Sequence, residues 1–97
     1  MRRVLWILTI VLVVLSARAD DRCAVEVRAE ARYGALGYNH IVHLKNLCDW
    51  QELCSVATDV NPSPVQAAVP PHVEVEVLTF RGSPATAFVP RVTCRPE

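Results

Sequence analysis

The sequence predicts a small all-β domain, an antiparallel β-sandwich stapled by disulfide bonds. Three observations carry this prediction. Apolar and polar residues alternate in several short segments, as in strands that bury one face. Glycines and prolines typical of turns separate these segments. Finally, four cysteines lie in a chain of 97 residues that opens with an export-type segment, and such chains form disulfides in oxidising compartments.

Residues 1–19 are typical of a secretory signal peptide. Two arginines form a charged start, an apolar run follows over 4–15, and small alanines precede the expected cleavage site after Ala19. The apolar run is shorter than the roughly 20 residues that a membrane-spanning helix needs, so an uncleaved anchor is the less favoured alternative. We expect a single secreted or periplasmic domain over residues 20–97.

Charge excludes some classes of partner. The chain has ten basic and ten acidic residues, and three of the basic ones lie in the signal, which leaves seven against ten and a net charge of −3. A mildly acidic domain is poorly suited to electrostatic binding of nucleic acid or anionic membranes. We therefore expect no nucleic-acid partner and no membrane contact after cleavage. A single lysine beside nine arginines, with abundant alanine and valine, indicates a bacterial source.

The first mature strand is predicted over residues 23–33. Apolar residues alternate there with Glu26, Arg28, Glu30 and Arg32. A helix would scatter these charges around its circumference, whereas a strand gathers them on one solvated face. Two glycines in residues 34–37 then predict a turn.

Residues 38–58 are predicted to form the central β-hairpin. Residues 38–48 carry apolar groups on both faces, which indicates an interior strand. Residues 49–52 are a polar interruption of a length that commonly reverses a chain, and an alternating segment follows. A helix over residues 48–54 is the alternative, because Trp50, Leu53 and Cys54 also fit a helical stripe.

The four cysteines predict two disulfides with three possible connectivities. Cys23 opens the first mature strand and Cys94 closes the last, so a bond between them would join the ends. Cys48 and Cys54 would then close the hairpin. This pairing is the expectation.

The second half of the chain predicts shorter strands. Residues 65–69 form a short edge strand between proline-containing segments, residues 72–80 alternate cleanly, and residues 81–84 form a turn. Residues 86–94 form the last strand, in which Pro90 indicates an edge position or a bulge, because proline has no amide hydrogen. Together these elements predict an immunoglobulin-like architecture, without the Cys, Trp, Cys spacing of true immunoglobulin domains.

Metal binding through histidines is the alternative function. Imidazole is a common metal ligand, and the chain offers His40, His43 and His72. On a strand, residues 40 and 43 point to opposite faces, so they could not hold one ion together. Cys48 and Cys54 with His40 could ligate zinc or copper, but their spacing is wider than in most structural zinc sites, and secretion favours disulfides. We expect no cofactor.

The sequence gives little indication of catalytic activity. The chain contains candidate nucleophiles, histidines and aspartates, but no nucleophile-elbow glycines and too few residues for a deep cleft. Asp59 and Asn61 resemble the start of a calcium loop that lacks the later ligands, so a side-chain-capped turn is the better account. We expect no catalytic residues and no enzymatic activity.

Trp50 is the candidate contact residue, because an exposed tryptophan beside acidic residues is typical of an interface anchor. The segment 62–71 is a second candidate contact surface. The sequence thus predicts a secreted, non-enzymatic module for protein interaction or cell-envelope function, whose partner it does not identify.

Overall fold

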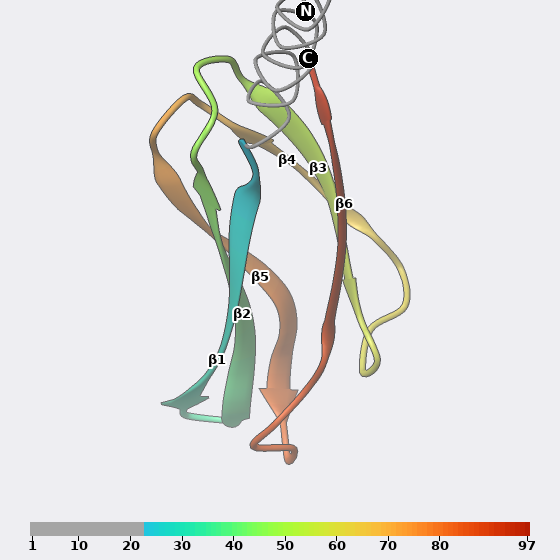
Figure 1. Cartoon of the computed structure of the whole chain (residues 1–97). Helices are drawn as coiled ribbons and strands as arrows, with labels where there is room; N and C mark the ends of the chain where they lie inside the picture. The colour runs from blue at the N-terminus through green and yellow to red at the C-terminus, as the bar shows by residue number, and fades with distance from the viewer. Residues whose placement is uncertain (1–22) are drawn as a thin grey trace, which may run out of the picture.

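The computed structural model describes residues 23–97, which form two antiparallel three-stranded sheets (Figure 1). The strands are β1 (Val25–Gly34), β2 (Gly37–Asn46), β3 (Glu52–Thr58), β4 (Val65–Val69), β5 (Glu74–Ser83) and β6 (Pro90–Pro96). This confirms the expected all-β sandwich. The expected signal peptide over residues 1–19 lies outside the described residues.

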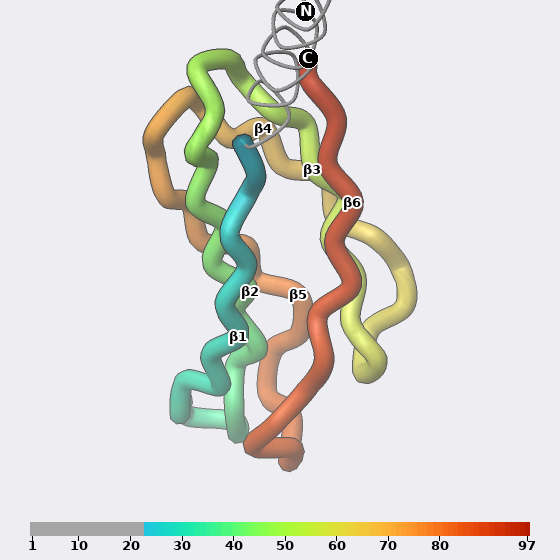
Figure 2. The backbone as a smooth tube through the Cα atoms, in the orientation of Figure 1, coloured from blue at the N-terminus to red at the C-terminus, as the bar shows by residue number. Residues whose placement is uncertain are grey.

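The order of strands is β1-β2-β5 in one sheet and β4-β3-β6 in the other. Immunoglobulin-type sandwiches likewise place their first, second and fifth strands together and their third and sixth strands in the facing sheet. The tube in Figure 2 shows the chain changing sheets after β2, after β4 and again after β5. The immunoglobulin-like architecture is therefore confirmed.

The β1–β2 hairpin has the expected turn. Gly34 and Gly37 pair across a two-residue connection, and Gly37 has a φ of 128°, which only glycine adopts readily. A Cβ atom at Gly37 would lie 2.8 Å from the carbonyl oxygen of Ser83. Gly37 thus allows β2 and the end of β5 to approach closely.

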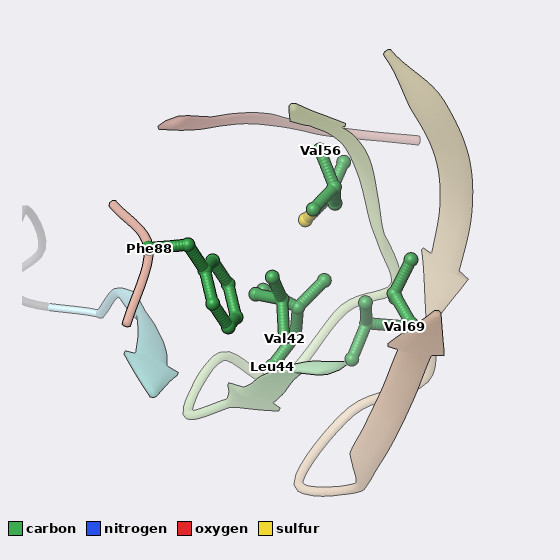
Figure 3. Packing of buried hydrophobic residues seen from close by; sticks show 7 residues of the cluster. Val42, Leu44, Val56, Val69 and Phe88 are labelled. Atoms are coloured by element: carbon green, nitrogen blue, oxygen red, sulfur yellow. The ribbon is translucent and has the colours of Figure 1, made fainter. Parts of the chain in front are cut away.

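The core lies between the two sheets, and the inward-facing residues of β2 are at its centre (Figure 3). Val42 and Leu44 are fully buried and pack with Val56, Val69 and Phe88. On the other face of β2, Ile41 and His43 are buried as well. The prediction that this strand is interior is confirmed.

The predicted hairpin over residues 38–58 is wrong, and so is its helical alternative. β2 and β3 belong to different sheets, and residues 47–51 between them form a non-helical crossing. Asn46 organises this crossing, because its Nδ2 donates to the carbonyls of Trp50 at 2.8 Å and Val69 at 3.0 Å, and its Oδ1 accepts the amide of Cys48. A short polar interruption suits a crossing between sheets as well as a turn within one.

The predicted disulfides, Cys23 with Cys94 and Cys48 with Cys54, are wrong in their pairing. The bonds join Cys23 to Cys48 and Cys54 to Cys94, so all four cysteines are used. The topology explains both bonds. The crossing that contains Cys48 passes the start of β1, where the amide of Leu47 donates to the carbonyl of Ala24. Cys54 and Cys94 lie directly opposite each other on β3 and β6.

The remaining strands are largely as predicted. Residues 65–69 form the edge strand β4, and Pro90 begins the edge strand β6. Two boundaries differ, because β5 continues to Ser83 through the predicted turn and residues 84–89 form a loop. The loop exists because Phe88 turns into the core, where its ring stacks on His40 with centroids 4.3 Å apart.

Candidate functional site

Charged side chains gather on the outer face of the β1-β2-β5 sheet. The register places Arg28 and Glu76 on either side of His43, and Glu26 and Glu74 on either side of Lys45. Because paired residues point to the same face, the alternating charges of β1 continue across all three strands. We call Glu30, Arg32, His43, Glu74 and Glu76 the charge cluster.

Arg32 is the cation at the centre of the charge cluster. Its Nε and Nη2 donate to the two carboxylate oxygens of Glu30 at 2.9 and 3.0 Å, and its Nη2 also reaches Glu76 at 3.2 Å. The fork of Arg32, aided by the hydrogen bond from His43, lowers the pKa of Glu30 from 4.5 to about 2. Glu30 is therefore a carboxylate at any physiological pH.

His43 lies beneath this surface and faces carboxylates from both ring nitrogens. Its side chain is 6% exposed, and its Nε2 lies 2.6 Å from Glu30 Oε1. Its Nδ1 lies 3.3 Å from Glu74 and 3.9 Å from Glu76, yet it makes no hydrogen bond within the described residues. Beside it, an open hollow of about 430 Å³ is lined by Glu26, Val27, Arg28, His43, Lys45 and Glu74.

The charge cluster contains a possible metal-ligand set. Ligand atoms of Glu30, His43 and Glu76 lie within 4.8 Å of one another. Sequence reasoning identified His43 but missed Glu30 and Glu76, although the alternation in residues 23–33 and 72–80 placed each glutamate on the charged face of a strand. Arg32 holds both carboxylates, so an ion would have to displace this guanidinium.

The three histidines lie apart. His40 and His43 point to opposite faces of β2, and the ring of His40 is fully buried, with its Nε2–H directed at the carbonyl of Ala85 at 2.9 Å. His40 therefore anchors the loop before β6. His72 has a φ of 59°, in the turn before β5, and its exposed ring contacts Asp49 at 2.7 Å. Cys48 and Cys54 are not available as thiolate ligands, because both are in disulfides.

The other polar candidates mostly cap turns. Asn61 Oδ1 accepts the amide of Ser63, which is the side-chain-capped turn that the sequence predicts. Asp59 Oδ1 accepts the amide of Val89 and thereby fixes the loop before β6. Ser83 Oγ accepts the amide of Ala85 in the same way. These contacts give each group a structural role.

Trp50 is held on the crossing between the sheets. It is 43% exposed, and its indole Nε1–H donates to Glu52 Oε2 at 2.6 Å. Two further features hold its backbone: Asn46 binds its carbonyl, and the neighbouring Cys48 is bonded to Cys23. The indole is therefore presented from a covalently pinned segment. The second predicted contact surface, residues 62–71, contains the edge strand β4.

No family model matches this chain, and no curated protein or solved structure matches it either. Within residues 23–97, no helix has the length and apolar character that crossing a membrane requires.

Proposed function

We propose that the protein is a secreted or periplasmic bacterial interaction module without enzymatic activity, and that Trp50 anchors its protein partner. The two disulfides support an oxidising compartment. The observation that carries the proposal is the half-exposed indole on a rigid crossing. A fixed side chain loses little conformational entropy on binding, and tryptophan is the residue most enriched among interface anchors.

The surroundings of Trp50 indicate the chemistry of the partner. Leu47 and Val73, which lie at the same end of the sandwich, are each 41% exposed, and the amide of Asn46 joins their two segments by donating to the carbonyl of Val73. Asp49 is almost fully exposed beside Trp50. A complementary partner would offer an apolar pocket for the indole, bordered by basic side chains.

The test is photo-crosslinking in the cell that secretes the protein, with the photoreactive residue at position 47 or 73. We expect one partner, identified by mass spectrometry, whose crosslink is lost in Trp50→Ala. Leu78→Ala is the matched control, because Leu78 is an apolar residue of similar exposure on the outer face of β5. Equal crosslinking in wild type and Trp50→Ala would refute the proposal.

A second candidate function is the binding of a divalent metal by Glu30, His43 and Glu76. The observation in its favour is that ligand atoms of these three residues lie within 4.8 Å of one another. Zinc accepts nitrogen and carboxylate ligands together. Because Arg32 occupies the same carboxylates, metal binding and the arginine fork exclude each other.

Calorimetry with Zn²⁺ tests this candidate. Stoichiometric binding should be lost in Glu76→Gln and tightened in Arg32→Gln, which frees both carboxylates. His72→Asn is the matched control, because it removes an exposed histidine outside the cluster. Absence of heat with wild type and with Arg32→Gln alike would eliminate the candidate.

A further inference from the structure

The outer edge of β1 is free among the described residues. The amide of Leu47 donates to the carbonyl of Ala24, on the β1 side of β2, whereas the amide of Asn46 donates to Val73, on the β5 side. Because backbone groups alternate along a strand, the even-numbered residues of β1 bond to β2. The amides and carbonyls of Val25, Val27, Ala29, Ala31 and Tyr33 therefore point away from the sheet.

This edge lacks the prolines, the short length and the bulge that limit pairing at the other edges. β6 begins and ends with a proline, β4 has only five residues, and the register of β5 against β2 is interrupted by a bulge. β1 has ten residues and no proline. Exposed edges of this kind pair with other strands unless charges or prolines prevent it.

Apolar side chains on the inward-facing side of β1 are also left uncovered at this edge. Val27 is 42% exposed and Tyr33 is 78% exposed. A hollow of about 200 Å³ lies beside them, lined by Ala29, Ala31 and the segment 86–88. A strand added to β1 would cover these side chains and this hollow.

We propose that a second copy of this chain pairs with β1 in antiparallel fashion about a two-fold axis at Ala29. The order of charges in β1 is self-complementary about this residue. Glu26 of one copy lies opposite Arg32 of the other, and Arg28 lies opposite Glu30, so four ion pairs form. On the inner face, Val27 lies opposite Ala31, next to the hollow. The result is one continuous six-stranded sheet.

Registers with a two-fold axis at a charged residue of β1 bring like charges together. A two-fold axis at Arg28 places Arg28 against its copy and Glu26 against Glu30, and an axis at Glu30 creates the same conflict. Like charges in directly opposed positions are destabilising. In the register at Ala29, the charged residues occupy the non-hydrogen-bonded pairs, in which side chains approach most closely. An axis at Val27 or Ala31 forms only two ion pairs, Glu26 with Arg28 or Glu30 with Arg32, so the four pairs formed at Ala29 favour that register.

The edge of β6 is less suited to pairing with a second copy than the edge of β1. Cys54 and Cys94 have Cα atoms 4.1 Å apart, which marks a non-hydrogen-bonded pair, so the amides of Val92 and Cys94 point outward. The other two outward positions of β6 are Pro90 and Pro96, which have no amide hydrogen, whereas β1 has five outward amides. The second copy is therefore assigned to β1. This dimer goes beyond the proposed role of Trp50 and does not depend on it.

The first test is sedimentation velocity of the purified protein, wild type and Ala29→Pro. Proline at position 29 removes an outward amide that makes no bond to β2, so the fold should survive while the dimer is lost. The matched control is Ala68→Pro on the edge strand β4. Cys54 directs its backbone groups toward Ala67, so the amide of Ala68 also points outward. Wild-type and Ala68→Pro dimers with a folded Ala29→Pro monomer support the proposal. A monomeric wild type, or a dimer that persists in Ala29→Pro, overturns it.

The second test decides the matter even if Ala29→Pro does not fold. Glu26→Arg and Arg32→Glu each replace two attractive pairs of the dimer with two repulsive ones, so each variant alone should dimerise about tenfold or more weakly than wild type. Mixed together, the two variants rebuild the pairs. The arginine introduced at position 26 then faces the glutamate introduced at position 32, and the unchanged Arg32 of the first variant faces the unchanged Glu26 of the second. A heterodimer in the mixture supports this register. If both variants remain monomeric in the mixture, this register is refuted.

Discussion

Removal of either disulfide tests whether the sandwich depends on the observed pairing. The bonds close loops with sequence separations of 25 residues for Cys23–Cys48 and 40 for Cys54–Cys94. In the chain-entropy relation these loops contribute about 3.5 and about 4 kcal/mol to stability. A domain of this size has about 5 to 10 kcal/mol in total. Each double alanine variant should therefore lose about half of its free energy of unfolding.

The assay is denaturation by guanidinium chloride, followed by the fluorescence of Trp50. Cys23→Ala with Cys48→Ala and Cys54→Ala with Cys94→Ala should lose similar amounts. A loss below about 1 kcal/mol in either variant would refute the reasoning from loop length. Peptide mapping gives the pairing itself: trypsin with a glutamate-specific protease cuts after Glu52 and separates Cys48 from Cys54. Peptide 46–52 should then remain bonded to the peptide that contains Cys23.

Three further predictions concern the core, the charge cluster and the first turn. Phe88→Ala should lower the free energy of unfolding by about 3–5 kcal/mol, because it empties a buried site, while Val89→Ala on the exposed side changes little. Arg32→Gln should raise the pKa of Glu30 from about 2 toward 4.5, as carbon-detected NMR titration would show, whereas Arg81→Gln should leave it unchanged. A carboxylate whose pKa is lower in the folded state stabilises the fold at pH values above its unfolded pKa, and this stabilisation disappears as the pH falls through its folded pKa. Wild type should therefore lose the contribution of Glu30 between pH 4.5 and about 2, and Arg32→Gln should lose less. Gly37→Ala should cost about 1–3 kcal/mol through its positive φ and the contact with Ser83, with Gly34→Ala as the milder control in the same denaturation assay.

The strands could be predicted from the sequence because alternation is a local property. Residues 38–48 carry apolar groups on both faces, and this alone indicated the interior position of β2. Pro90 indicated an edge because its missing amide hydrogen rules out a full ladder. These features need no knowledge of which strand lies beside which.

The pairing of strands and cysteines could not be obtained in this way. Residues 49–52 have the polar composition of a hairpin turn, but Asn46 directs the chain into the other sheet by binding the carbonyls of Trp50 and Val69. The four cysteines allow three disulfide connectivities, and the sequence does not distinguish them until the strands that pair with β3 are known. The charge cluster depends on the same information, because Glu74 and Glu76 reach His43 only through the β2–β5 register.

Salt distinguishes the two interaction surfaces, because they rest on different forces. The proposed β1 dimer aligns four exposed ion pairs, and such pairs weaken as the screening length falls from about 14 Å at 0.05 M salt to about 4 Å at 0.5 M. We expect the dimer Kd to rise about tenfold over this range, measured by sedimentation velocity. A contact through the indole of Trp50 removes mainly apolar surface from water, so salt should weaken it little. If the dimer keeps its affinity in 0.5 M salt, the charges of β1 do not select the partner, and the apolar end of the sandwich around Trp50 becomes the better location for self-association.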